Sequence, residues 1–254
     1  LFNLITTVIL WPLLPYFVKL VTFVVPGEDV VIEQRPLYIE DRVLGTPAAL
    51  IGAQREAVRM GELAITMVEQ AVNAFLQGDL GLLEQIEQRE EAVNTLEKEI
   101  TAYLAKANQF PMAESQARFL TNLMHIVNDL ERMGDHAINI AELAHIRSGE
   151  KLELSQGASE DLEHMFKVVL EISRDALDAL FHRNVAQAEA LISRDDLVDD
   201  LEKRYRTNHI ARLNQGLCHP EIGVLFLDAV SNLERVGDHA NNIAEAVADI
   251  AFAK

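Results

Sequence analysis

Two rows of polar side chains repeat in the chain at helical spacing. Asp129–Ala144 reads DLERMGDHAINIAELA and Asn232–Val247 reads NLERVGDHANNIAEAV, with 11 of the 16 aligned positions identical. Each copy places a glutamate four residues before an aspartate: Glu131 with Asp135, and Glu234 with Asp238. Like charges at this spacing share one helix face and destabilise the helix by roughly 0.2–0.5 kcal/mol. The pattern therefore calls for a compensating positive charge.

Local arginines explain part of this pattern. Arg132 precedes Asp135 by three residues, and Arg235 stands in the same place in the second copy. These ion pairs account for the aspartates but not for the glutamates. They also leave unexplained a glycine inside each helix, Gly134 and Gly237, which costs about 1 kcal/mol relative to alanine. The glycines predict that another helix passes close to each of them.

A second acidic pattern precedes each copy. Gln88–Glu99 reads QREEAVNTLEKE and aligns with Ser193–Arg204, SRDDLVDDLEKR, 105 residues later. If this helix and the next are antiparallel neighbours, their carboxylates meet across a groove and offer oxygen ligands to a cation. The predicted metal ligands are Glu90, Glu131, Asp135, Asp195, Asp199, Glu234 and Asp238. Iron, zinc, manganese and magnesium are the candidate ions.

A polar seam held by salt bridges is the alternative to a metal site. Asn94 stands where the second repeat has Asp199, so the second repeat is the better metal candidate. His136 and His239 follow the seam aspartates and either add a ligand or form ordinary hydrogen bonds.

An enzyme is a weaker interpretation. Ferritin-like metal oxidases carry two Glu-x-x-His motifs. This sequence has one, at Glu142–His145, and the second copy reads EAVA there. We found no glycine-rich phosphate loop, nucleophile elbow or Cys-His arrangement. We therefore predict no catalytic residues and no enzymatic activity, with a carboxylate-bridged metal oxidase as the less favoured alternative.

Helices must position these acids. Apolar residues recur at i, i+3 and i+4 through most of the chain, and no segment alternates like a strand, so we predict an all-α fold. Aligning Glu131 with Glu234 gives an offset of 103 residues, close to the 105 above. The sequence thus predicts a tandem repeat of two three-helix bundles, residues 46–149 and 150–254, which pack together. The second helix of the second repeat is predicted as one helix from Asn184 to about Gln215.

The first 26 residues differ in composition. Leu1–Val25 carries one charge, Lys19, and about 20 apolar residues are enough to cross a bilayer. We predict a transmembrane segment at 1–26 and a linker at 27–45, with a buried apolar arm as the alternative. Because the chain begins with Leu, we expect it to be the C-terminal piece of a longer protein.

The net charge limits the possible binding partners, and the cysteine content limits the possible disulfides. The formal net charge of −18 disfavours nucleic acid, because phosphate binding needs a basic surface. The single cysteine, Cys218, excludes an internal disulfide.

The doubled LERMGDHAINIAE and LERVGDHANNIAE, with the upstream REEAVNTLE and RDDLVDDLE, resemble the PhoU domain. This resemblance implies a duplicated three-helix bundle that regulates phosphate uptake. The family's Glu-x-x-x-Asp motif matches Glu131/Asp135 and Glu234/Asp238, and its Asp-x-x-x-Asp motif matches Asp195/Asp199. In some members of the family these acids bind metal clusters.

The apolar segment and the connector YIEDRVLGTPAALIGAQREAVRMGE resemble the C-terminal part of bacterial Na/Pi cotransporters. This resemblance implies a regulatory domain on the cytoplasmic side of the inner membrane. Its partner would be the transporter's membrane domain on the same parent chain, with the sodium and phosphate sites upstream. A free-standing PhoU-type adaptor is the alternative, and a homodimer is left open.

Overall fold

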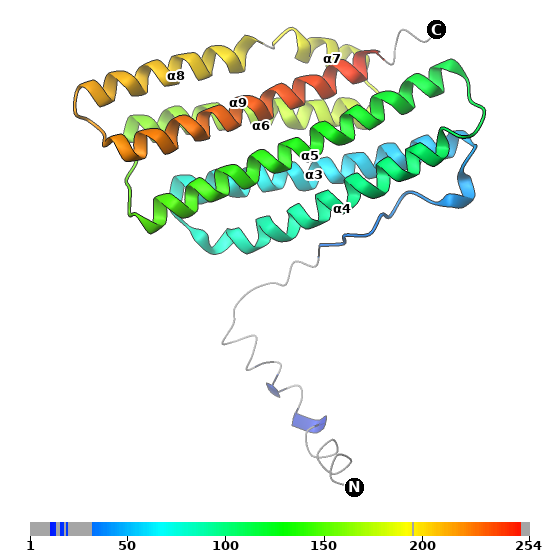
Figure 1. Cartoon of the computed structure of the whole chain (residues 1–254), viewed down its shortest axis with the longest axis horizontal. Coiled ribbons are helices and arrows are strands. Elements are labelled where there is room, and N and C mark those ends of the chain that lie inside the picture. Colours follow the sequence, from blue (N-terminus) through cyan, green and yellow to red (C-terminus); the bar gives the residue numbers. More distant parts are fainter. Residues whose placement is uncertain (1–10, 14–15, 18, 20–31, 195, 250–254) are drawn as a thin grey trace. The chain divides into compact units, whose positions relative to one another are not determined.

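The computed structural model describes residues 11–13, 16–17, 19, 32–194 and 196–249. The chain divides into two compact units, Leu1–Val31 and Ile32–Lys254. In the described part of the second unit the regular elements are all helices (Figure 1), and the predicted all-α fold is confirmed.

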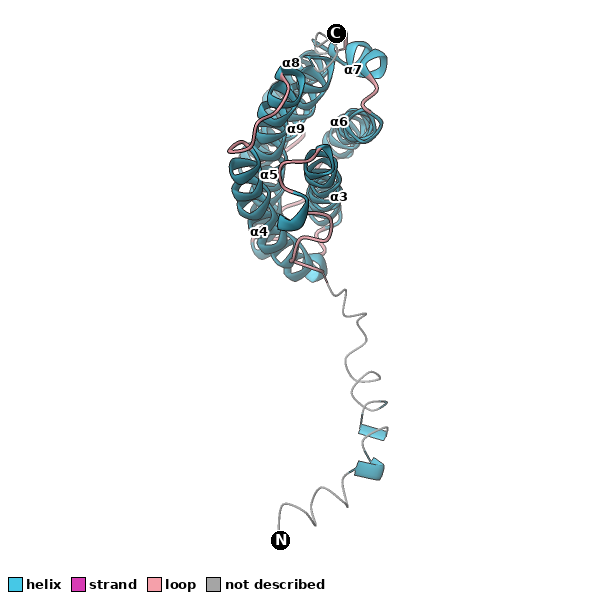
Figure 2. Cartoon of the chain, turned by 90° about the vertical axis from the view of Figure 1, so that its right-hand side faces the viewer, coloured by secondary structure: helices cyan, strands magenta, loops and turns pink. Residues whose placement is uncertain are grey.

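The second unit contains two successive sets of helices. The first set is α3 (Pro47–Gln77), the short 3-10 helix η3 (Leu80–Leu82), α4 (Leu83–Ala107) and α5 (Glu114–Gly149). The second set is α6 (Gln156–His182), α7 (Val185–Ile192), α8 (Asp196–Asn214) and α9 (Pro220–Asp249). Helices α8, α9, α5 and α4 lie side by side in one layer, and α6 and α3 pack against one face of it (Figures 1 and 2).

The helix ends follow local sequence signals. Pro47 opens α3, where its missing N–H costs nothing. Gly78 ends the same helix in the left-handed conformation, at φ 70°, which glycine adopts without strain. The Asn184 side chain accepts a hydrogen bond from the Gln187 amide and caps α7. Thr46, the residue before α3, does not cap the helix, because its hydroxyl donates to the Val43 carbonyl.

An apolar stripe with helical spacing runs along α5 and is buried throughout. It consists of Val127, Leu130, Gly134, Ala137, Ala141 and Ala144. The corresponding face of α9 is also buried, and the two helices pack against each other at the centre of the unit. This packing fixes the position of the polar row beside each stripe.

The prediction of a single helix from Asn184 to about Gln215 was wrong, because the segment is divided. The structure has two helices there, α7 and α8. No glycine or proline occurs between Asn184 and Asn214 to signal the break. The new helix start places Asp196 and Asp199 in the first turn of α8, where negative charge stabilises the exposed backbone N–H groups.

Residues 32–46, which we call the strap, are held against α3 and α4. The fully buried Glu56 carboxylate on α3 accepts hydrogen bonds from the Leu37 and Tyr38 amides, each at 2.7 Å. The Tyr103 hydroxyl on α4 donates to the Glu40 carbonyl at 3.1 Å. The described part of the predicted linker is therefore a docked segment.

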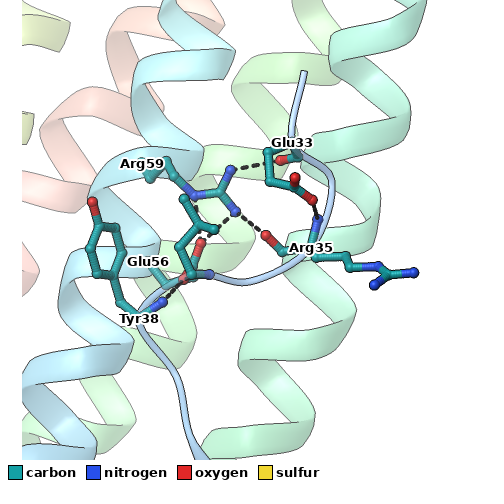
Figure 3. Close-up of polar contacts among 6 residues, drawn as sticks. Glu33, Arg35, Tyr38, Glu56 and Arg59 are labelled. Carbon is teal, nitrogen blue, oxygen red and sulfur yellow. Dashed lines mark hydrogen bonds and ion pairs between the residues drawn. The ribbon is translucent and has the colours of Figure 1, made fainter. Parts of the chain in front are cut away.

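Arg59 completes this attachment (Figure 3). Its Nε donates to the Glu56 carboxylate at 2.6 Å, and its two terminal nitrogens donate to the Glu33 and Arg35 carbonyls at 2.8 and 2.9 Å. The buried acid is thus neutralised by an arginine that also binds the strap backbone. Burying a carboxylate is tolerated only when it is paired and hydrogen-bonded in this way.

Among the described residues, no helix has both the length and the hydropathy needed to cross a bilayer. Most of the segment predicted as transmembrane, namely residues 1–10, 14–15, 18 and 20–26, lies outside the described residues. That segment stays a prediction.

Replacing Glu56 with Gln is expected to lower the free energy of unfolding by about 2–4 kcal/mol. The amide cannot accept from two backbone N–H groups and the guanidinium at once, so buried donors lose their acceptor. Urea denaturation measures the change, and faster amide hydrogen exchange at Leu37 and Tyr38 locates it. The exposed Glu62→Gln on the same helix is the matched control, and equal stability of the two variants would contradict this description of the strap.

Candidate metal site

Helices α8 and α9 bring three of the predicted ligands together in the second repeat. Asp199 comes from α8, and Glu234 and Asp238 come from α9. One carboxylate oxygen of each lies within 4.8 Å of the others. Asp195, the fourth predicted ligand of this repeat, lies outside the described residues. The expected meeting of acids across the groove between the two helices therefore occurs for three residues.

Glu234 is the carboxylate most affected by this crowding. Burial raises its pKa above the ordinary value, and the negative charges of Asp238, Asp199 and Glu202 raise it further. Arg235 acts in the opposite direction and is the weakest of these influences. The local arginine therefore does not balance the acids around Glu234.

The other acids of this groove have partners at its edge. Lys203 approaches Asp199 at 3.4 Å, one turn further along α8. The Arg206 guanidinium donates to Glu202 at 2.7 Å. These cations lie on the same helix as their acids, so they do not bridge α8 and α9.

The first repeat contains a related but incomplete arrangement. Burial raises the pKa of Glu90 on α4, and the negative charge of Asp135 on α5 raises it further. Asn94 donates a side-chain hydrogen bond to Glu90, which lowers that pKa. The Asn94 side-chain amide is therefore a neutral partner of Glu90, whereas the second repeat has the negatively charged Asp199 at the aligned position.

Glu131 is the least satisfied acid of the first repeat. Its Oε2 is buried and has no hydrogen-bond partner, and the Arg132 Nε approaches it only to 3.7 Å. Burial raises the Glu131 pKa, and the charges of Asp135 and Glu97 raise it further. A buried carboxylate oxygen without a hydrogen bond is uncommon and fits a site that accepts a cation.

Glu97 and Glu202 are site residues that the sequence analysis did not select. They occupy aligned positions, three residues after Asn94 and Asp199, and both add negative charge to the neighbouring glutamate. The signal was present, because the two stretches share the same Leu-Glu-Lys tripeptide at this point. These glutamates fall outside the i, i+4 spacing of the acids that mark the site.

The two histidines face each other between α5 and α9. The rings of His136 and His239 are stacked with their centroids 5.5 Å apart. The Nδ1 of His136 lies 2.9 Å from the Asn232 side-chain oxygen, and the Nδ1 of His239 lies 2.9 Å from Asp129. Each ring is therefore oriented by the opposite repeat.

Both histidines line a hollow of ≈ 590 Å³ together with Glu234, Asp238 and Glu245. The hollow shares two acids with the cluster of three described above. The cluster therefore opens towards a polar space from which an ion can enter.

The glycine prediction is confirmed most clearly in the second repeat. A Cβ built on Gly237 would lie 3.0 Å from the Val198 side chain of α8. A Cβ on Gly134 would lie 3.5 Å from Val93 of α4, which is ordinary van der Waals contact. Close approach of α8 is what brings Asp199 to the acids of α9.

The donor set fits a hard or borderline cation. Every described ligand is a carboxylate oxygen, and carboxylates on facing helices are the ligands that magnesium, manganese and iron bind in helical bundles. The excess negative charge at Glu234 in the second repeat, and the Glu131 oxygen without a hydrogen bond in the first, favour the approach of a cation. The second repeat has the more complete site.

Comparison with known proteins places the chain in a family. The PhoU domain matches it twice, over residues 57–144 and 162–247. The chain belongs to the PhoU domain family. The two matched stretches lie within the two predicted repeats, and the sequence resemblance to PhoU is confirmed.

Relatives of the chain are accessory proteins. The phosphate-specific transport system accessory protein PhoU homolog 1 of Thermotoga maritima is 33% identical over 168 residues, covering 65% of this chain and 71% of the relative. A PhoU homolog of Pseudomonas putida is 32% identical over 207 residues, covering 77% and 78%. The crystal structure of PhoU from Pseudomonas aeruginosa has a TM-score of 0.74 at 26% identity and covers 80% of this chain and 96% of that one.

These names confirm the prediction of a regulatory protein rather than an enzyme. They are names of PhoU proteins and do not show a cotransporter parent, which stays a prediction.

The two glycines are expected to respond differently to alanine. Gly134→Ala has room for its methyl group and gains helix propensity, so the free energy of unfolding should stay level or rise by up to about 1 kcal/mol. Gly237→Ala presses on Val198 and should be the less stable of the two. Thermal unfolding of both variants decides the order, and a more stable Gly237→Ala would refute the close approach of α8.

Neutralising Glu234 is expected to stabilise the metal-free chain at pH 7 by about 0.5 kcal/mol. Its folded-state pKa is raised, so the ionised group destabilises the fold above that pKa, and the penalty disappears as the pH falls towards the unfolded-state value. The advantage of Glu234→Gln should therefore shrink from pH 7 to pH 4.

Denaturant titrations of the metal-free protein across this pH range measure the advantage. The exposed Glu163→Gln on α6 is the control and should show no such trend. A Glu234→Gln protein less stable than the parent at pH 7 would mean that Glu234 is well paired without a cation.

Proposed function

We propose that this chain regulates phosphate transport as a PhoU-type accessory protein and that it binds a metal ion between α8 and α9. The observation that carries the metal part is the convergence of Asp199, Glu234 and Asp238, whose carboxylate oxygens lie within 4.8 Å of one another. The accessory role is supported by the matched family and by the names of the relatives, which are phosphate-specific transport system accessory proteins.

The chain's own residues explain how such a site would affect the fold. Asp199 on α8 and the two acids on α9 repel one another, and Val198 packs directly against Gly237 between them. The spacing of α8 and α9 therefore depends on how much of this repulsion remains. A bound cation supplies positive charge at this point. The position of α8 is then the feature that a partner in the transport system would recognise.

The position of α4, the second helix of the first repeat, is expected to depend less on a bound cation than the position of α8 does. Asn94 already satisfies Glu90 with a neutral hydrogen bond, so fewer charges need compensation there. Glu90, Glu131 and Asp135 remain a proposed weaker site.

Metal analysis of the intact chain, purified without chelator, tests the site. The triple variant Asp199→Asn, Glu234→Gln, Asp238→Asn should retain less than about one tenth of the parent's bound iron, manganese, zinc or magnesium, because three charged ligands are lost together. The matched control Glu90→Gln, Glu131→Gln, Asp135→Asn should retain most of it. Equal metal content in parent and triple variant would rule out this site.

Uptake of labelled phosphate tests the regulatory role. Cells lacking the gene are compared with cells that express the parent chain or the triple variant. We expect phosphate uptake to change in cells that lack the gene and to return to normal in cells that express the parent chain. Restoration by the triple variant as well would keep the regulatory role and separate it from the metal site, whereas no effect of the deletion would reject the regulatory role.

A second candidate is the regulatory domain of a sodium-dependent phosphate transporter. It is favoured by the composition of Leu1–Val25, whose single charge is Lys19. Fractionation of cells that express the native protein separates the candidates. Retention in the membrane pellet after alkaline carbonate favours the transporter domain, and release into the supernatant favours the free-standing accessory protein.

A further inference from the structure

A groove between α3 and α6 lies apart from the acidic cluster. Its largest hollow has a volume of ≈ 410 Å³ and an apolar floor that includes Val58, Ile65, Leu177 and Phe181. Phe181 is 52% exposed although it is a large aromatic residue. None of these residues belongs to the candidate metal site.

The groove continues along α3. A second hollow, of ≈ 260 Å³, shares Phe181 with the first and adds Ile51, which is 45% exposed. A third hollow, of ≈ 230 Å³, shares Ile51 and reaches Phe119 on α5. Ile51, Val58 and Ile65 are seven residues apart, so they lie on one side of α3 over about 21 Å.

This length and spacing match an α-helix. About 14 helical residues span 21 Å, and apolar side chains at i, i+3, i+4 and i+7 form a stripe that lies into a groove of this kind. Single exposed apolar residues are common on protein surfaces, but here the exposed isoleucine and phenylalanine line one continuous depression.

The charged residues beside the groove set the polarity of the occupant. Glu62 and Asp178 are exposed on opposite sides of the largest hollow. Among the described residues Glu62 makes no ion pair, and Asp178 pairs with His182, one turn further along α6. Arg174 is already paired with Glu69 at 2.7 Å. Arg55 is exposed beside the second hollow and has no acidic partner in the described part of the chain.

We infer that the α3–α6 groove binds an amphipathic helix of a partner protein. Its apolar stripe would cover Ile51, Val58 and Phe181. Lysine or arginine residues at one end would face Glu62 and Asp178, and an acidic residue near the other end would face Arg55. The inference adds a partner class to the proposed regulatory function and rests on it only in assuming that the chain acts through a protein partner.

Binding of designed peptides to the intact chain tests this groove. The probe is an 18-residue fluorescent amphipathic helix with leucine at i, i+3, i+4 and i+7, lysines at one end and a glutamate near the other. The comparison peptides are a scrambled sequence and one with every charge reversed. The assay contains neither phosphate nor added metal, so its outcome is independent of the metal-binding and uptake experiments.

The first peptide should bind at least about tenfold more tightly than the other two. Phe181→Glu should weaken this binding about tenfold or more, and Glu62→Lys with Asp178→Lys should shift the preference to the charge-reversed peptide. The exposed Glu163→Lys, elsewhere on α6, should change the affinity less than about twofold. Hydrogen exchange should slow in residues 51–69 and 174–183.

Equal binding of the three peptides, or protection confined to other helices, would overturn the inference. A second copy of the chain is the competing occupant. If sedimentation shows a dimer that Phe181→Glu converts to monomer, the groove is an interface between copies and the partner-helix inference is wrong. Unchanged sedimentation, with unchanged thermal unfolding of the variant, supports the inference.

Discussion

Repulsion between carboxylates on neighbouring helices is the constraint on which the rest of this structure depends. The pKa of Glu234 is raised by burial and by acids on both α8 and α9. Glu131 has a buried carboxylate oxygen without a hydrogen bond. A helical bundle built for stability alone would pair or remove these groups. Both repeats retain them at corresponding positions, so the duplicated scaffold stores unfavourable electrostatic energy at two equivalent grooves, more of it in the second.

The packing of the bundle makes that repulsion sensitive to helix position. The apolar stripes of α5 and α9 are both buried, and the glycine in each stripe lies against a valine of a neighbouring helix, Val93 of α4 or Val198 of α8. Gly237 lets Val198 approach closely, and Asp199 follows it into the groove. The strap is fastened to α3 by Glu56 and Arg59. The α3–α6 groove is lined by residues of α3, α5 and α6, so the proposed partner surface and the acidic cluster on α8 and α9 involve different helices.

Much of this arrangement was predictable because duplication doubles the information in the sequence. The repeated LER-x-GDHA stretch fixed the periodicity of α5 and α9, and the glycines within it predicted the close helix. The break between α7 and α8 was not predictable, because no proline or glycine marks it.

Glu56 was overlooked for a different reason. A glutamate in an amphipathic helix is ordinarily solvated, and only the backbone of a distant segment turns it into a buried acceptor. Glu97 and Glu202 show the same limit, since their contribution depends on which helices become neighbours.

The central claim is that cations stabilise the α8–α9 groove by relieving carboxylate repulsion, and hydrogen exchange of the α8 amides tests it most directly. The metal-free chain is compared with the chain in Mn²⁺, and with the chain in sodium chloride of equal ionic strength. We expect Mn²⁺ alone to slow exchange in Asp196–Asn214, with a smaller effect in Leu83–Ala107, where Asn94 replaces an acid. Identical exchange in Mn²⁺ and sodium chloride would contradict the account.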